Sequence, residues 1–291
     1  MNPEIPIESF KVFATGLDHP DGLAFDRHGD LWAGGEAGQI YRISSQGRVE
    51  TVANVGAFCG GLAFSPADTL FVCCPGLGVV AVEATGEYSV FATHAGGHKM
   101  ICPNYGVFDS AGNYFVTDSG NWRKGNGHLL RFTPDGKSAV MGGPYGYASG
   151  LALSADERSL FMAESNTGRV FRFELAVDGS VVSHEIYAEE CGRFPEGLSL
   201  DAEGNLYVSC HASDEIHRIS PVREKTLLAW DGFSILLGSP ANMAFGGANF
   251  DEMFVANLAR TTITRAIVER KGQPLANQKV KKKLRPRPSA L

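Results

Sequence analysis

Asp21-Gly22-Leu23-Ala24-Phe25 is the first of six related stretches that together decide the fold. In each stretch a small or polar residue, usually followed by glycine, precedes an apolar strand. The other five are Gly60-Gly61-Leu62-Ala63-Phe64, Tyr105-Gly106-Val107-Phe108, Ser149-Gly150-Leu151-Ala152-Leu153, Glu196-Gly197-Leu198-Ser199-Leu200 and Ala241-Asn242-Met243-Ala244-Phe245. Their first residues are separated by 39, 45, 44, 47 and 45 positions. Strand-rich repeats of about 40–50 residues are typical of the blades of a β-propeller.

Each repeat divides into four short strands joined by tight turns. The first repeat shows the pattern, with strands predicted at Leu23–Phe25, Leu31–Ala33, Ile40–Ile43 and Glu50–Ala53. The turn after its first strand contains Gly29, which suits a hairpin connection that requires a positive φ. The sequence therefore predicts an all-β fold, a six-bladed β-propeller with four-stranded antiparallel blades.

The N-terminal segment is predicted to close the ring. Phe10–Thr15 resembles Val90–Thr93, which is the fourth strand of the second repeat, whereas the last repeat has no clear fourth strand after Thr264–Ala266. We therefore expect residues 8–15 to complete the sixth blade and to protect sheet edges that would otherwise be exposed. The predicted propeller spans residues 1–275, and the basic residues 276–291 are predicted to form a flexible tail.

Composition and charge narrow the classes of partner. The net charge is −6 and the chain has no broad basic surface, which argues against nucleic acid as a ligand. No apolar stretch reaches the length of a membrane span, and Met1–Phe10 lacks the basic start and apolar run of a signal peptide. The six cysteines match no zinc-binding spacing. We expect a cytoplasmic protein with reduced thiols and a small-molecule ligand.

The residues that open the repeats are candidates for a metal site. In a propeller the first strand of each blade runs along the central channel, so its first residue lies at the channel mouth. Asp21, Asn104, Ser149 and Glu196 stand at or next to four of these positions. Two carboxylates, an amide and a hydroxyl suit a hard divalent cation such as Ca²⁺ or Mg²⁺. Without a cation the two carboxylates would raise each other's pKa. The alternative is that these are turn residues, satisfied by backbone amides.

Four of the repeats and the last blade carry a family resemblance. The chain resembles the SMP-30/gluconolactonase/luciferin-regenerating-enzyme family and is similar to propellers of the diisopropyl fluorophosphatase type. The stretches that carry the resemblance are Pro20-Asp21-Gly22-Leu23, Asn104-Tyr105-Gly106-Val107-Phe108-Asp109, Ser149-Gly150-Leu151-Ala152-Leu153-Ser154, Pro195-Glu196-Gly197-Leu198-Ser199-Leu200-Asp201 and Pro240-Ala241-Asn242-Met243-Ala244-Phe245.

The resemblance implies a metal-dependent hydrolase of a sugar lactone or a related cyclic ester. It implies one divalent cation at the channel mouth, with Ca²⁺ as the first expectation and Zn²⁺, Mg²⁺ or Mn²⁺ as alternatives. The cation would polarise the carbonyl of the lactone, with Glu196 as the base and Asn104 as a ligand or substrate contact. Three ligand positions depart from the family pattern, since Asp21 replaces Glu, Ser149 replaces Asn and Glu196 replaces Asp.

Further residues are expected to contact the substrate around the mouth. They are His98, Tyr105, Trp122, Tyr147 and His211. His211 follows a second strand and is a candidate proton carrier, because imidazole titrates near neutral pH. Trp122 lies in a long polar loop that is either a substrate-covering loop or an ordinary long hairpin loop. Two other functions stay open at this point: a metal-free enzyme similar to strictosidine synthase, and a propeller that binds a small molecule without catalysis.

Overall fold

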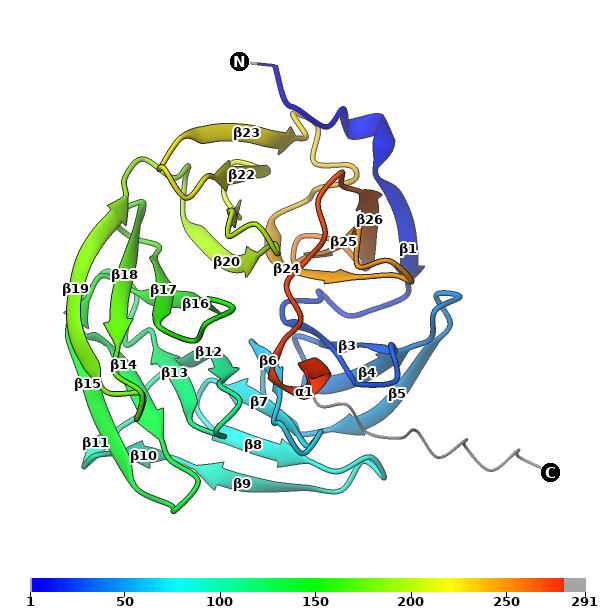
Figure 1. Cartoon of the computed structure of the whole chain (residues 1–291). Coiled ribbons are helices and arrows are strands. Elements are labelled where there is room, and N and C mark those ends of the chain that lie inside the picture. The colour runs from blue at the N-terminus through cyan, green and yellow to red at the C-terminus, as the bar shows by residue number, and fades with distance from the viewer. Residues whose placement is uncertain (1, 280–291) are drawn as a thin grey trace.

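The computed structural model describes residues 2–279 and forms a ring of six β-sheets around a central channel (Figure 1). Each sheet has four antiparallel strands, which confirms the predicted six-bladed propeller. From the channel outward, the first three blades consist of β2 (Leu23–Phe25), β3 (Leu31–Gly34), β4 (Gln39–Ile43) and β5 (Val49–Asn54); β6 (Leu62–Phe64), β7 (Leu70–Cys74), β8 (Gly78–Val82) and β9 (Tyr88–Ala92); and β12 (Pro103–Phe108), β13 (Tyr114–Asp118), β14 (Gly127–Phe132) and β15 (Ser138–Tyr145).

The other three blades follow the same order from the channel outward. They consist of β16 (Ala148–Leu153), β17 (Ser159–Glu164), β18 (Arg169–Leu175) and β19 (Val181–Ala188); β20 (Pro195–Leu200), β21 (Leu206–Cys210), β22 (Glu215–Ile219) and β23 (Lys225–Trp230); and β24 (Pro240–Gly246), β25 (Glu252–Asn257), β26 (Thr262–Ile267) and β1 (Lys11–Thr15). A short hairpin, β10 (His94–Ala95) and β11 (His98–Lys99), precedes the third blade.

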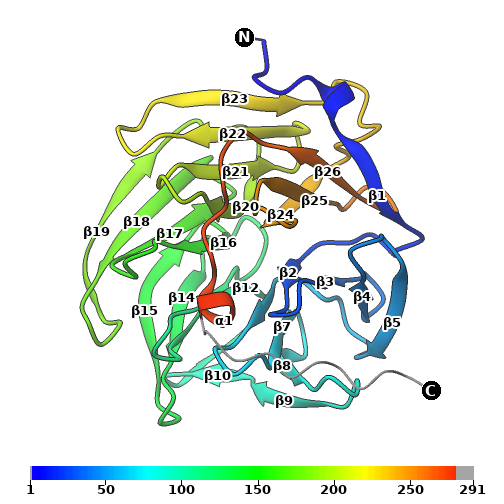
Figure 2. The same cartoon turned by 45° about the vertical axis from the view of Figure 1, so that its right-hand side comes forward.

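The N-terminal strand closes the ring as predicted. β1 pairs antiparallel with β26, with Lys11 opposite Arg265 and Thr15 opposite Thr262, and a 3-10 turn at Ile7–Ser9 leads into it. Figure 2 shows β1 at the outer edge of the sixth blade, beside β26. The first and last strands of the propeller therefore share one sheet, and the blade cannot form without both ends of the ring.

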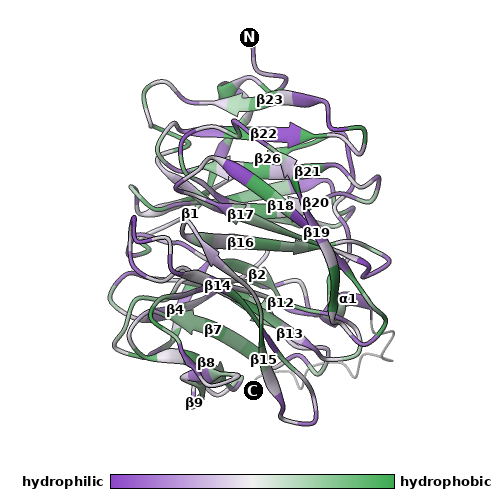
Figure 3. Cartoon of the chain, turned by 90° about the vertical axis from the view of Figure 1, so that its left-hand side faces the viewer, coloured by the Kyte–Doolittle hydropathy of each residue, from purple (hydrophilic) through white to green (hydrophobic). Residues whose placement is uncertain are grey.

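The core lies between neighbouring blades. Between the first and second blades, the ring of Trp32 packs edge-on against Phe64 at 5.8 Å, among the buried side chains of Ile40 and Val72. Figure 3 shows hydrophobic colour along inner strands such as β7 and β16 and hydrophilic colour in many connecting loops. The apolar character of the inner strands follows from this packing, because both faces of each blade are covered by another blade.

Glycines next to the opening residues let the inner strands approach one another. A Cβ atom on Gly22 would lie 2.1 Å from the carbonyl oxygen of Gly60, and one on Gly150 would lie 2.0 Å from that of Glu196. These separations are far below van der Waals contact, so no other residue fits there without movement of the backbone. The repeated glycine thus sets the narrow diameter of the channel and brings the opening residues together.

The segment after β26 seals one end of the channel. It crosses the centre of the ring and ends in α1 (Ala276–Lys279), as Figure 1 shows. Gln273 Nε2 donates to the carbonyl oxygen of Leu153 at 2.9 Å, and Asn277 Nδ2 donates to that of Phe25 at 3.0 Å. The packed structure therefore extends beyond the domain boundary predicted at residue 275. The rest of the predicted basic tail, residues 280–291, lies outside the described residues.

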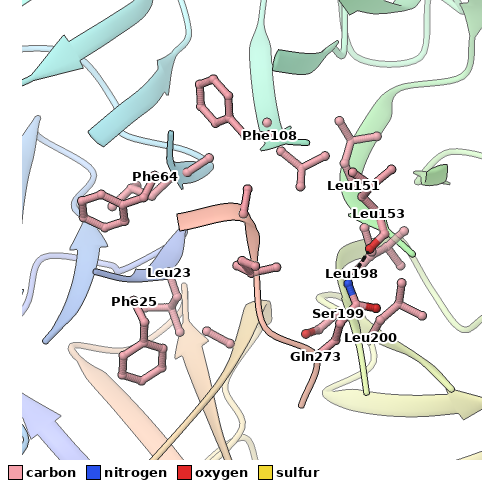
Figure 4. Close-up of a pocket in the computed structure, with 18 of the residues that line it drawn as sticks. Leu23, Phe25, Phe64, Phe108, Leu151, Leu153, Leu198, Ser199, Leu200 and Gln273 are labelled. Carbon is pink, nitrogen blue, oxygen red and sulfur yellow. Dashed lines mark hydrogen bonds between the residues drawn. The ribbon is translucent and has the colours of Figure 1, made fainter. Parts of the chain in front are cut away.

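The channel beneath this segment is apolar. The ends of the inner strands and the C-terminal segment enclose a cavity of about 70 Å³, which Figure 4 shows with Phe25, Phe64 and Phe108 on one side and Leu153 and Leu200 on the other. Its lining is mostly apolar, with Ser199, Gln273 and Gln278 among its polar members. Among residues 2–279, no helix is long and apolar enough to cross a membrane.

Candidate functional site

The predicted ligand residues gather at the open end of the channel, opposite α1. Asp21 directly precedes the turn into β2, Asn104 lies in β12, Ser149 in β16 and Glu196 in β20. The far ends of the same strands line the cavity beneath the C-terminal segment. Because all six inner strands run in the same direction along the channel, residues that open them meet at one mouth.

Asp21 and Glu196 form a pair of poorly solvated carboxylates at this mouth. Asp21 is 8% exposed, the Glu196 side chain is 17% exposed, and neither carboxylate accepts a hydrogen bond from any residue between 2 and 279. Burial raises the pKa of Asp21 to about 7. Burial and, to a smaller extent, the charge of Asp21 raise the pKa of Glu196 well above its ordinary value. The pair therefore lacks the positive charge or the donors that normally stabilise buried carboxylates.

Asn104 and Ser149 differ in how free their side chains are. The backbone oxygen of Asn104 accepts a hydrogen bond from Gly61 at 2.7 Å, but its carboxamide makes none within the described part of the chain. The hydroxyl of Ser149 is fully buried and lies 2.7 Å from that of Ser165, which donates to the carbonyl oxygen of Pro195 at 2.7 Å. Asn104 is thus available to a ligand, whereas the Ser149 hydroxyl is already engaged by Ser165, whose own hydroxyl bonds to the next blade.

Tyr105 and Asn242 form the floor of the mouth. The hydroxyl of Tyr105 lies 2.9 Å from Nδ2 and 3.1 Å from Oδ1 of the fully buried Asn242. The ring of Tyr105 packs over Gly61, where a Cβ atom would lie only 2.7 Å from the ring. Asn242 was not among the predicted site residues. In the sixth repeat Asn242 occupies the position at which the other repeats carry glycine, and this departure from the repeat was the signal in the sequence.

His211 stands beside Glu196. Its Nδ1 lies 3.7 Å from Oε2 of Glu196, and both ring nitrogens are buried without a hydrogen-bond partner in the described chain. Burial lowers the pKa of His211, which keeps the imidazole neutral near pH 7. A neutral, unpartnered imidazole next to a carboxylate is well suited to accept or pass on a proton.

Aromatic side chains line one wall of the mouth. The ring of Trp122 lies 4.8 Å from Tyr147 and 5.0 Å from Phe194, and Phe194 lies 6.1 Å from His211. The hydroxyl of Tyr147 contacts Sγ of Cys102 at 3.9 Å. Trp122 and Tyr147 were predicted substrate contacts, and the structure brings them together. Phe194 was missed, although it stands two residues before Glu196.

His98 is held in a separate, neighbouring contact. Its Nε2 lies 2.7 Å from Oδ2 of Asp118, and its ring lies 4.4 Å from that of His128. Asp118 is fully buried and also accepts hydrogen bonds from the backbone amides of Ile101 and Cys102, at 3.1 and 2.7 Å. Asp118 therefore fixes the loop that leads to Asn104, and His98 belongs to this support.

A second acidic group lies on the rim of the first blade. The Nδ1 atom of His19 lies 2.9 Å from Asp18 and 3.2 Å from Glu36, so that these three side chains are near enough to share a metal ion. Asp18 also accepts hydrogen bonds from Ala37 and Gln39. These hydrogen bonds of Asp18 stabilise a turn at the surface, and they explain why the three side chains lie close together.

The donors at the mouth are oxygen atoms from three blades. Asp21 and Glu196 contribute carboxylates with no hydrogen-bond donor near them, and Asn104 contributes a free amide oxygen. Hard divalent cations prefer such ligands, and two negative charges would balance one cation. The fold and the mouth together define a propeller with acidic and aromatic side chains at one end of its channel.

The chain belongs to the SMP-30/Gluconolactonase/LRE-like family, whose model matches residues 37–259. It is 27% identical over 161 residues to regucalcin of Homo sapiens, covering 52% of this chain and 53% of that protein. It is 28% identical over 163 residues to lactonase drp35 of Staphylococcus saprophyticus, covering 50% of this chain and 48% of that protein. The chain thus spans about half the length of the curated relatives it matches.

The fold agrees with that of solved structures. The structure of a calcium-binding protein, regucalcin, from Agrobacterium tumefaciens superimposes with a TM-score of 0.78 and 17% identity. The superposition covers 95% of this chain and 99% of that one. At this level of identity the similarity supports the propeller fold over nearly the whole length of this chain.

Proposed function

We propose that the protein hydrolyses a lactone at the channel mouth, with one divalent cation held by Asp21, Glu196 and Asn104. The observation that carries the proposal is the pair of buried carboxylates without hydrogen-bond donors. Two such groups are costly to keep ionised in a low-dielectric site unless a cation lies between them. Family membership and the lactonase among the relatives favour a lactone as the substrate.

Ca²⁺ is the proposed cation. The donors are oxygen atoms only, and the calcium-binding relatives point the same way, whereas Zn²⁺ more often has nitrogen or sulfur ligands. Mg²⁺, Mn²⁺ and Zn²⁺ are the alternatives that a competition experiment resolves. Ser149 is the weakest member of the proposed ligand set, because its hydroxyl already contacts Ser165.

Each residue at the mouth has a separate role in the proposed reaction. A divalent cation at this position supplies the positive charge that polarises the carbonyl of the lactone. Glu196 accepts a proton from the attacking water, and general-base assistance of this kind accelerates reactions by about 10²–10⁴-fold. His211 Nδ1, 3.7 Å from Glu196 Oε2, is placed to take that proton onward. Asp21 holds the positive charge, and the Asn104 amide orients the substrate oxygen.

Hydrolysis assays test this function. We expect turnover of a δ-lactone that stops on treatment with a chelator and returns on addition of Ca²⁺, and that falls by about 10²–10⁴-fold in Glu196→Gln. Glu203→Gln, at the exposed end of the turn after β20, is the matched control and keeps full activity. Turnover that is insensitive to chelator would favour a metal-free enzyme, and saturable binding without turnover would favour a binding protein. A cytoplasmic location and the absence of a nucleic-acid or membrane partner stay predictions.

A further inference from the structure

Three aromatic side chains at the mouth have no role in the proposed reaction. We call them the aromatic wall; they are Trp122, Tyr147 and Phe194, whose rings meet edge-on at 4.8 and 5.0 Å. Trp122 is 45% exposed although it is the largest of the three. The three residues lie in three separate loops, one within the third blade and two that join the third to the fourth blade and the fourth to the fifth, so the wall is not a by-product of one turn.

The wall is continuous with the carboxylate pair. Phe194 stands two residues before Glu196, and its ring lies 6.1 Å from that of His211, which contacts Glu196. Tyr147 reaches Cys102, two residues before Asn104, through its hydroxyl at 3.9 Å. A substrate whose carbonyl lies at Glu196 and Asn104 therefore places its substituent against these rings.

Both Tyr147 and Phe194 adopt a left-handed backbone conformation, with φ of 69° and 55°. This conformation is uncommon for aromatic residues. Here it turns both side chains toward Trp122.

Polar groups that could receive the hydroxyls of a sugar are scarce at this mouth. The hydroxyl of Tyr105 is bonded to Asn242, that of Ser149 contacts Ser165, and that of Tyr147 contacts Cys102. Besides Asp21, Asn104, Glu196 and His211, which the proposed reaction uses, few polar groups near the wall are unpartnered in the described chain: they include the buried Oδ1 of Asn166 and the guanidinium of Arg123, which lies 5.7 Å from the Trp122 ring. Sugar hydroxyl groups that are buried without hydrogen-bond partners oppose binding.

We propose that the lactone carries an aromatic or other apolar substituent, which packs against Trp122, Tyr147 and Phe194, and that a polyhydroxylated lactone is a poor substrate. This inference rests on the proposed function and names its substrate class. Burial of a phenyl-sized group favours binding by about 1.5–3 kcal/mol, which corresponds to roughly 10- to 150-fold in specificity.

Three lactones with the same six-membered ring test the inference. They are unsubstituted δ-valerolactone, 5-phenyl-δ-valerolactone and glucono-δ-lactone, each corrected for spontaneous hydrolysis. We expect kcat/KM for the phenyl compound to exceed that for δ-valerolactone by roughly 10- to 150-fold. Trp122→Ala and Phe194→Ala should lower this ratio to a few-fold. Trp230→Ala is the matched control, because Trp230 is 49% exposed on β23, outside the wall, and should preserve the ratio.

Calorimetry with the phenyl-substituted δ-lactam, which keeps the shape of the lactone but resists hydrolysis, separates the two proposals. If the wild type binds this lactam and Trp122→Ala binds it at least tenfold more weakly, the apolar specificity stands even if no lactone is turned over. If glucono-δ-lactone is hydrolysed best, or if the phenyl compound has no advantage in the wild type, the specificity is wrong although the lactonase function holds.

Discussion

Asp21→Asn should stabilise the metal-free protein at alkaline pH and leave its stability nearly unchanged at acid pH. In the unfolded chain the carboxyl group has an ordinary pKa of 3.8, whereas burial in the folded protein raises it to about 7. The folded state therefore binds a proton more tightly than the unfolded state. The stability that this proton contributes is complete below pH 3.8, is lost as the pH rises from there to about 7, and is absent above it.

The size of the effect follows from the two pKa values. A difference of one unit corresponds to 1.36 kcal/mol, so the shift from 3.8 to about 7 amounts to roughly 4 kcal/mol at pH 8. Asparagine has almost the same shape and carries no charge, so it removes this cost. With cation at 100 times Kd the wild type gains about 2.7 kcal/mol that the variant does not, so the advantage of the variant at pH 8 shrinks to roughly 1 kcal/mol.

Urea unfolding of chelator-treated protein between pH 4 and pH 8 measures the difference. Asp251→Asn, which removes a half-buried carboxylate just before β25 and outside the mouth, is the matched control. Equal stability of the wild type and Asp21→Asn at pH 8 without cation would refute the reasoning, because it would mean that Asp21 is well solvated or already compensated.

Two further predictions concern the scaffold and use urea unfolding of the purified variants. Gly150→Ala should destabilise the protein by about 3 kcal/mol or more, because its Cβ would lie 2.0 Å from the carbonyl oxygen of Glu196. In the control Gly146→Ala the new Cβ meets no atom closer than 3.4 Å, so this change should be tolerated. Equal losses of stability in both variants would contradict this packing. Asn277→Ala should cost about 1–3 kcal/mol, because it leaves the carbonyl oxygen of Phe25 without its donor, and an unchanged midpoint would show that α1 does not seal the channel.

The architecture of the ring could be predicted from the sequence because its determinants are local and repeated. Glycines beside the opening residues are required where inner strands approach closely, and Gly22 and Gly150 show how little space is left. The closing role of β1 was visible because Phe10–Thr15 resembles the fourth strand of another blade while the last blade lacked one.

The candidate site was predicted only in part. Asp21, Asn104 and Glu196 follow from the repeat register, since register alone places them at one end of the channel. Phe194 and the support by Asp118 depend on loop conformations that have no periodic pattern, and their contacts join separate blades or loops. The channel seal formed by residues 272–279 was missed because its polar contacts to Leu153 and Phe25 involve backbone oxygens, which leave no trace in composition.

The most direct test of the central claim is the metal content of the purified protein, measured by plasma mass spectrometry after chelation and readdition of Ca²⁺, Mg²⁺, Mn²⁺ or Zn²⁺. We predict about one equivalent of cation per chain in the wild type, with Ca²⁺ bound in competition with the others, and a loss of this equivalent in Asp21→Asn and in Glu196→Gln. Asp18→Asn, on the rim of the first blade, should keep it. No bound metal under any of these conditions, or the same content in both mouth variants as in the wild type, would contradict a cation site at Asp21 and Glu196.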